Sequence, residues 1–131
     1  INKVFTWQQM LELIGGQYDH IRIKDELHDT AKKYIVPGHE GTFAVISTMS
    51  APFCGTCNRM RLSADGKMKN CLFSKEETDL LTAFRNGEPL EPLITQNIMK
   101  KAEALGGQFN TDFEHLEAEA IKNRSMITIG G

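Results

Sequence analysis

Three cysteines are the residues of this sequence best suited to chemistry, and all of them lie within one stretch of the chain. Cys54, Cys57 and Cys71 follow the spacing Cys-x2-Cys-x13-Cys. The residues between the second and third cysteine are typical of a β-hairpin that turns at Asp65-Gly66, and such a hairpin returns Cys71 to the first pair. Three thiolates that converge in this way predict a metal centre with one coordination position that no cysteine fills.

The spacing alone leaves three kinds of centre open. A structural zinc ion needs a fourth protein ligand, for which His28 and His39 are candidates, although neither has a conventional ligand spacing to the cysteine pair. A cubane iron–sulfur cluster takes three thiolates and keeps one iron open to an outside ligand. Cys54 and Cys57 could instead form a redox-active disulfide.

The register of the hairpin decides which side chains accompany the third cysteine. We favour a three-residue loop that ends with Gly66 in the left-handed conformation, because Asp65 before such a glycine is usual for that loop. This register pairs Arg61 with Lys69 and predicts one cationic face and one apolar, buried face. The cationic face comprises Arg59, Arg61, Lys67 and Lys69 together with Cys71, and the apolar face comprises Met60, Leu62, Ala64, Met68 and Leu72.

Positive charge is concentrated beside the cysteines. Residues 58–70 contain four Lys and Arg residues and one Asp, a local balance of +3, whereas the whole chain carries −2. A solvated hairpin face is the ordinary interpretation of such a charge run. Next to an open metal position, the sharper interpretation is an anion site, since guanidinium groups match phosphate and carboxylate.

The hairpin and the end of the chain together resemble a known enzyme family. The run from Phe53 to Gly66, followed by Cys71-Leu72-Phe73, resembles the C-terminal part of the GTP 3′,8-cyclase family, radical-SAM enzymes that start molybdenum cofactor biosynthesis. The last ten residues, 122–131, independently resemble that family's tail, which ends in two glycines. The resemblance covers most of the chain, from the helix at Trp7 to the last residue.

This resemblance implies a substrate-binding role. A 4Fe-4S cluster would leave one iron open for the purine ring of GTP, so the cluster would anchor the substrate and would not generate the radical. The residues that the resemblance assigns are Cys54, Cys57 and Cys71 as cluster ligands, Arg59 and Arg61 as contacts to GTP, and Gly130 and Gly131 as the tail that completes the active site.

The resemblance also indicates what this chain lacks. The family begins with a partial TIM barrel that carries a Cys-x3-Cys-x2-Cys motif for a cluster that binds S-adenosylmethionine, and this sequence has no cysteine before Cys54. Since the sequence begins with Ile1, we expect a C-terminal fragment without the N-terminal radical-SAM barrel. We expect the fragment alone to be inactive. S-adenosylmethionine and the second cluster would belong to the full-length enzyme, as would a homodimer.

The element pattern predicts an α+β fold that forms a single C-terminal module, residues 1–131. Residues from about 1 to 50 would be the end of an incomplete (β/α) barrel with a β-hairpin, and those from about 51 to 131 the iron–sulfur substrate-binding region, C-terminal helices and tail. The expected strands are 21–23, 33–36 and 42–48. The expected helices start at Trp7 after a Thr6–Gln9 capping box, at Ser74 with an end at Gly87, at Leu90 with an end at Gly106-Gly107, and at Thr111.

Composition excludes several other classes of protein. A chain of 131 residues with 40% apolar residues can bury one modest core. Three clustered cysteines argue against a secreted disulfide framework. The pI near 6.1 gives no support for nucleic-acid binding. Because no signal peptide and no apolar span of about 20 residues is found, we expect a cytoplasmic protein that does not bind membranes.

Two rival functions stay open at this stage. A zinc-stabilised structural or interaction module would bind one zinc ion per chain and unfold on chelation. A carrier activated at its C-terminal carboxylate would react at Gly131, as ubiquitin-like proteins do.

Overall fold

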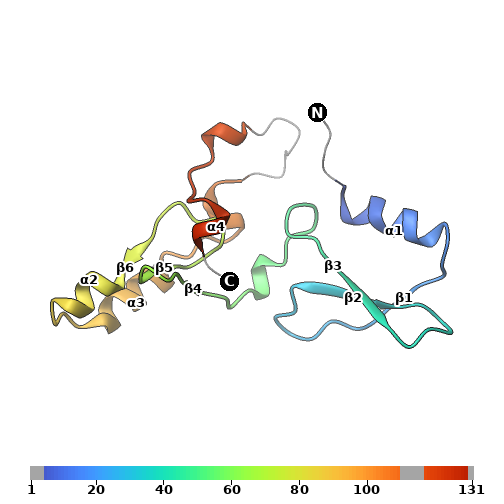
Figure 1. Cartoon of the computed structure of the whole chain (residues 1–131), viewed down its shortest axis with the longest axis horizontal. Coiled ribbons are helices and arrows are strands. Elements are labelled where there is room, and N and C mark those ends of the chain that lie inside the picture. Colours follow the sequence, from blue (N-terminus) through green and yellow to red (C-terminus); the bar gives the residue numbers. More distant parts are fainter. Residues whose placement is uncertain (1–4, 110–116, 130–131) are drawn as a thin grey trace. The chain divides into compact units, whose positions relative to one another are not determined.

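The computed structural model describes residues 5–109 and 117–129, which belong to two compact units. The first unit ends at Cys57 and the second begins at Asn58. Figure 1 labels the helices and strands of both units. Each unit contains a 3-stranded antiparallel sheet together with short helices. This mixture of helices and small antiparallel sheets confirms the predicted α+β class.

The first unit contains the predicted N-terminal helix and sheet. Its elements are α1 (Trp7–Gly15), β1 (Ile21–Arg22), β2 (Ala31–Ile35), β3 (Thr42–Ile46) and the 3-10 turn η1 (Cys54–Thr56). The capping box at the start of α1 is confirmed, because the side chain of Thr6 accepts a hydrogen bond from the Gln9 amide and the Gln9 side chain accepts one from the Thr6 amide. The half-buried side chains of α1 include the four that helical spacing predicts: Trp7, Met10, Leu11 and Ile14.

The core of the first unit lies on β2, the central strand of the order β1-β2-β3. Tyr34 is buried and stacks on Phe43, its partner in β3, with 5.2 Å between ring centroids. Its hydroxyl accepts a hydrogen bond from Nε1 of Trp7 at 3.0 Å. Trp7 therefore packs α1 onto the sheet, as expected of a core anchor.

The second unit contains the hairpin that follows the first two cysteines. Its elements are β4 (Arg61–Leu62), β5 (Lys67–Lys69), β6 (Thr78–Asp79), α2 (Leu80–Arg85), α3 (Leu90–Met99), the 3-10 turns η2 (Leu105–Gly107) and η3 (Ala118–Ala120), and α4 (Met126–Ile129). Strand β5 is central in the order β4-β5-β6, and both α2 and α3 contact it. The buried apolar residues of this unit are Met68, Leu80, Ala83, Leu105 and Ile129.

The helix predicted to begin at Ser74 begins six residues later, at Leu80. The Ser74 hydroxyl does not cap a helix; it donates toward the carbonyls of Cys71 and Glu76. Residues 78–79 pair with β5 as an edge strand, and Asp79 becomes the N-cap by accepting a hydrogen bond from the Thr82 amide at 3.0 Å. A strand pairing with a partner ten residues away thus overrides the local capping signal.

The next helix is shorter than predicted. Helix α3 ends at Met99, whereas the apolar pattern predicts a helix as far as Leu105. Leu105 is buried with φ 47°, and Gly106 follows with φ 67°. A Cβ on Gly106 would lie 2.4 Å from the carbonyl carbon of Phe73. The helix therefore ends before Leu105, since the chain adopts positive φ there, buries the Leu105 side chain and passes close to the backbone of Phe73 and Ser74.

The helix predicted from Thr111 lies largely outside the described residues, and its described end is the 3-10 turn η3. Among residues 5–109 and 117–129, no helix combines the length and apolar character needed to cross a membrane.

Candidate metal centre

The first two cysteines lie at the two ends of one turn in the first unit. Cys54 opens η1, and the amide of Cys57 donates to the carbonyl of Cys54 at 3.1 Å. Both side chains are half-buried, and neither forms a disulfide. One turn of separation suits two ligands of the same metal or cluster.

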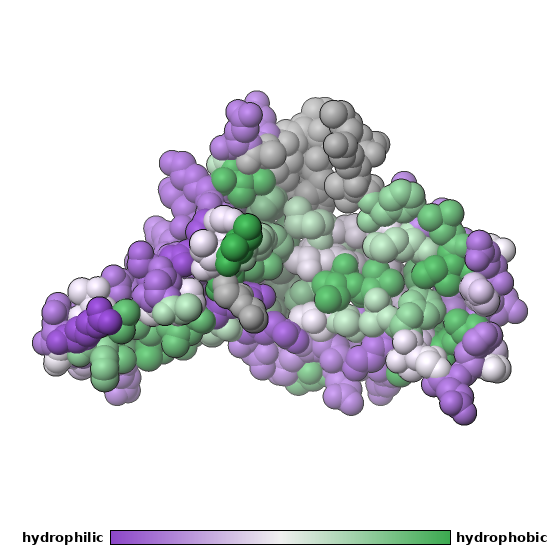
Figure 2. Space-filling view, in the orientation of Figure 1, coloured by the Kyte–Doolittle hydropathy of each residue, from purple (hydrophilic) through white to green (hydrophobic). Residues whose placement is uncertain are grey.

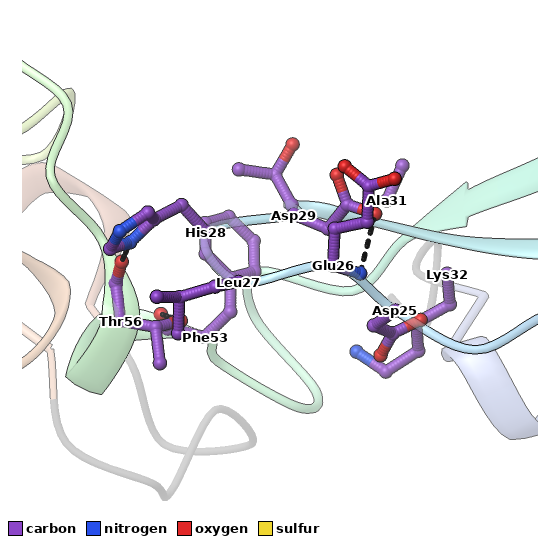
Figure 3. A pocket seen from close by; sticks show the side chains of 10 residues that line it. Asp25, Glu26, Leu27, His28, Asp29, Ala31, Lys32, Phe53 and Thr56 are labelled. Atoms are coloured by element: carbon purple, nitrogen blue, oxygen red, sulfur yellow. Dashed lines mark hydrogen bonds between the residues drawn. The ribbon is translucent and has the colours of Figure 1, made fainter.

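A histidine contacts this turn. Nδ1 of His28 forms a hydrogen bond with the carbonyl of Thr56, between the two cysteines (Figure 3). His28 is one of two non-glycine residues with positive φ in the described parts of the chain, at 74°. This contact could not be predicted from local sequence, in which His28 was only a candidate zinc ligand, because the two residues lie 28 positions apart.

A surface hollow of about 350 Å³ adjoins the turn and is drawn in Figure 3. Its lining includes the carboxylates of Asp25, Glu26 and Asp29, opposed by the ammonium group of Lys32. Asp25 and Asp29 are each paired with a neighbouring cation, Arg22 and Lys33 respectively. Because no feature of the hollow points to a particular ligand, we assign it no role in binding.

The third cysteine lies in the second unit, two residues after β5. Cys71 is half-buried and forms no disulfide. Its carbonyl accepts hydrogen bonds from the amide of Ser74 at 3.1 Å and from the Ser74 hydroxyl at 2.9 Å. Within either unit, the described His, Cys, Asp and Glu side chains form no group of three that could hold a metal ion by itself.

The predicted hairpin register is confirmed. Arg61 pairs with Lys69, and the amide of Ser63 donates to the carbonyl of Lys67 at 3.0 Å. Gly66 closes the three-residue loop with φ 75°. Asp65 accepts a hydrogen bond from the Ser63 hydroxyl at 2.5 Å.

The predicted faces of the hairpin are partly wrong. Lys69 was expected on the cationic face but is buried, with 2% of its surface exposed, whereas Leu62 was expected to be buried and is 67% exposed. Met68 is buried, as predicted. Alternation between a wet and a dry face holds only where one side of a sheet meets solvent. Strand β5 is central and contacts α2 and α3, while Lys69 reaches Asn123, so the consecutive residues Met68 and Lys69 are both buried.

Lys69 is therefore a structural cation. Its Nζ donates to Oδ1 of Asn123 at 2.6 Å and lies 3.9 Å from Oε1 of Glu77. Burial lowers the pKa of Lys69, and the neighbouring Glu77 carboxylate opposes that effect. Because its ammonium group is occupied within the fold, Lys69 is not among the candidates for binding a substrate anion.

The arginines that the sequence singled out remain at the surface. Arg59 and Arg61 are exposed and lie in the second unit, before the hairpin loop. Arg61 is the first residue of β4, and Arg59 precedes that strand by two residues. The backbone carbonyl of Arg59 accepts a hydrogen bond from Nζ of Lys101 at 2.8 Å. Their guanidinium groups are accessible to an anionic ligand.

The sequence analysis missed one arginine that organises this unit. One guanidinium nitrogen of Arg124 donates to Asp65 at 3.1 Å, and the other donates to Asp65 at 3.0 Å and to Glu77 at 2.5 Å. These contacts raise the pKa of Arg124 and, with the Ser63 hydroxyl, lower the pKa of Asp65 to about 2. The acceptors lie 59 and 47 residues away, so no local spacing could reveal them.

The predicted tail glycines, Gly130 and Gly131, lie outside the described residues. The segment before them forms α4, in which Ile129 is buried with 4% exposure while Ile127 is exposed. Ile129 is therefore part of the apolar core of the second unit.

Comparison with known proteins adds a match over most of the chain. Residues 1–106 match the family described as Molybdenum Cofactor Synthesis C. A mouse protein named Molybdenum cofactor biosynthesis protein 1 is 36% identical over 132 residues, which cover 98% of this chain and 20% of that protein. An Arabidopsis thaliana protein named GTP 3′,8-cyclase, mitochondrial, is 33% identical over 135 residues, which cover 100% of this chain and 33% of that protein.

A bacterial relative gives a similar result. A Rhodopirellula baltica protein named GTP 3′,8-cyclase is 43% identical over 96 residues, which cover 72% of this chain and 25% of that protein. The chain thus spans between 20% and 33% of the length of these three relatives.

Proposed function

Because the chain belongs to the Molybdenum Cofactor Synthesis C family, we propose that it is the substrate-binding C-terminal part of a GTP 3′,8-cyclase. The observation that carries this proposal is the Cys-x2-Cys-x13-Cys motif with its arginine-bearing hairpin, inside a chain that matches relatives of that name over 72% to 100% of its length. In this role the chain binds GTP for radical cyclisation to the cyclic pyranopterin precursor of molybdopterin. The whole enzyme would be a lyase.

Cys54, Cys57 and Cys71 would hold a 4Fe-4S cluster. The donor set fits this group, since three half-buried thiols outside any disulfide are soft ligands that select iron–sulfur clusters or zinc. When bound, the cluster would supply an open iron that anchors the purine of the substrate. The protein's own contribution is to hold the nucleotide in position and to balance its charge.

Arg59 and Arg61 would bind the nucleotide. Their exposed guanidinium groups follow Cys57 by two and four residues, so a nucleotide anchored at the cysteines would lie within their reach. Guanidinium groups form bidentate hydrogen bonds with phosphate oxygens, and GTP carries several negative charges. Gly130 and Gly131 would complete the pocket as a slim backbone strand.

Radical generation would belong to an N-terminal barrel with its own cluster and S-adenosylmethionine. Residues from about 1 to 50 would contribute the last part of that barrel. The exposed apolar side chains of the first unit support this assignment, because Leu13, Ile21 and Ile46 are between 55% and 63% exposed. Figure 2 shows hydrophobic residues gathered on the surface of this unit. The chain alone would bind but not react. Its cytoplasmic location stays a prediction, since the name of the Arabidopsis relative places that protein in mitochondria.

Alanine substitutions of the two arginines test the proposal. We expect Arg59→Ala and Arg61→Ala each to weaken GTP binding by roughly 1.5–3 kcal/mol, because each removes a charged hydrogen bond to the nucleotide. The measurement is isothermal titration of GTP into the intact, anaerobic enzyme. Arg85→Ala is the matched control, since Arg85 is an exposed arginine on α2.

If GTP affinity is unchanged in both hairpin variants, these arginines leave the site. If it falls equally in the Arg85 variant, the effect is one of general charge and not of contact.

One observation favours a second candidate, a zinc-stabilised structural or interaction module. Because the carbonyl of Thr56 can only accept a hydrogen bond, Nδ1 of His28 would donate to it, and Nε2 would be the ring nitrogen that acts as a ligand. Three cysteines and one histidine form a closed zinc site. Substitution of His28 by Asn separates the two candidates. It should lower the zinc content if His28 is a zinc ligand, and it should leave the iron content unchanged if the three cysteines hold an iron–sulfur cluster.

A further inference from the structure

The last described segment of the chain, residues 122–129, is fastened to the hairpin unit at two points before Arg124. The side chain of Gln108 bonds both the amide and the carbonyl of Lys122, each at 2.9 Å. Asn123 accepts a hydrogen bond from the buried ammonium group of Lys69 at 2.6 Å and donates to the carbonyl of Leu72 at 3.0 Å. These contacts fix the start of the segment, but they do not fix its direction beyond Asn123.

Arg124 supplies the contacts that set this direction. Its guanidinium group donates to both carboxylate oxygens of Asp65 and to Glu77, and it also donates to the carbonyl of Thr128 at 3.1 Å. The Arg124 side chain is 18% exposed, and of its acceptors the Glu77 side chain is also 18% exposed, whereas the Asp65 side chain is 49% exposed. The guanidinium group thus connects Asp65 in the hairpin loop, Glu77 before β6 and Thr128 in α4, the last described helix.

We propose that Arg124 is a positioning residue that directs the last described segment, residues 125–129, relative to the substrate-binding hairpin. Asp65 lies in the loop between β4 and β5, and β4 begins at Arg61, which we assign to GTP binding. Arg124 also holds Thr128, within that segment. The inference rests on the proposed function, because that function makes the hairpin a substrate-binding element.

The geometry requires arginine. Four acceptor oxygens surround Arg124, and a planar guanidinium with five N–H donors can serve them together. A lysine ammonium has three donors on a single nitrogen and cannot reach oxygens on both sides of a fork. We therefore expect Arg124→Lys to restore the charge without restoring the direction of the segment.

The first experiment measures amide hydrogen exchange across residues 125–129 of the chain. In Arg124→Gln we expect severalfold faster exchange in this segment and unchanged exchange in β2, because the segment opens locally once its fork is lost. Arg124→Lys should recover little of the protection. Arg85→Gln, which removes an exposed arginine from α2, is the matched control and should exchange as the wild type does.

A second experiment separates positioning from binding in the intact cyclase. We expect Arg124→Gln to lower kcat severalfold while the KM for GTP stays near the wild-type value, whereas loss of a substrate contact would raise KM. Should Arg124→Gln fail to fold, Asp65→Asn weakens the loop contact, because it removes the charge and one of the two acceptor oxygens while the contact with Glu77 remains. It should give the same pattern more weakly.

Hydrogen exchange in residues 125–129 that stays at the wild-type rate in Arg124→Gln and in Asp65→Asn would overturn the proposal. A raised KM for GTP with an unaltered kcat in Arg124→Gln would also overturn it. These outcomes differ from failure of the proposed function. If the wild-type enzyme binds no GTP, the proposed function fails before any variant is compared, whereas the exchange measurement requires neither cluster nor nucleotide.

Discussion

Serine in place of Cys71 is expected to abolish assembly of the iron–sulfur cluster, and so are Cys54→Ser and Cys57→Ser. A hydroxyl oxygen is a hard ligand that replaces a thiolate poorly at iron–sulfur clusters. With three thiolates as the whole protein ligand set, loss of any one leaves two irons without a protein ligand. Iron and acid-labile sulfide, measured after anaerobic purification, should fall to near background in all three variants.

This prediction tests whether the three cysteines act as one ligand set. An equal loss of iron in all three variants would mean that Cys54, Cys57 and Cys71 hold the same cluster. Met99→Ser is the control, because it removes a sulfur atom from a side chain that is 80% exposed and lies outside the motif. Wild-type iron content in Cys71→Ser, with iron lost in Cys54→Ser, would remove Cys71 from the ligand set.

Alanine at Gly106 is expected to destabilise the second unit far more than alanine at Gly87. Both glycines have positive φ, 67° and 72°, so each substitution should cost about 1–2 kcal/mol for the left-handed conformation. At Gly106 the new Cβ would also lie 2.4 Å from the carbonyl carbon of Phe73 and 2.5 Å from the amide nitrogen of Ser74. At Gly87 it would meet nothing within 4 Å.

The clash at Gly106 involves backbone atoms that cannot rotate away, and we expect it to add about 1–3 kcal/mol. The difference between the two variants in the free energy of unfolding, measured in urea, separates the cost of this clash from the cost of the left-handed backbone conformation. The contact also bears on the site, because the amide and hydroxyl of Ser74 hold the carbonyl of Cys71. Equal stability of Gly106→Ala and Gly87→Ala would contradict the close approach.

Local signals predicted the parts of the fold that local chemistry decides. The capping box of Thr6 and Gln9 placed the start of α1, and the Asp65-Gly66 pair placed the loop and the register of the hairpin. In both cases the deciding hydrogen bonds join residues at most four apart, so the sequence contains the whole argument.

Features that depend on distant partners could not be read in this way. Lys69 looked like part of a wet cationic face, but its partner Asn123 lies 54 residues away. The capping signal at Ser74 lost to a strand pairing with β5, and the pattern up to Leu105 could not show that the chain must turn early to bury it. Of the candidate site, the sequence supplied the ligand types and the arginines, whereas the Arg124 fork required the folded chain.

The most direct test of the central claim is the iron, zinc and sulfide content of the chain purified without oxygen, followed by a GTP titration of its optical spectrum. We expect about four irons and about four sulfides per chain, a broad brown absorbance and a saturable spectral change with GTP. One zinc ion per chain with no iron, and a spectrum indifferent to GTP, would contradict the claim and identify the cysteine centre as a structural zinc site.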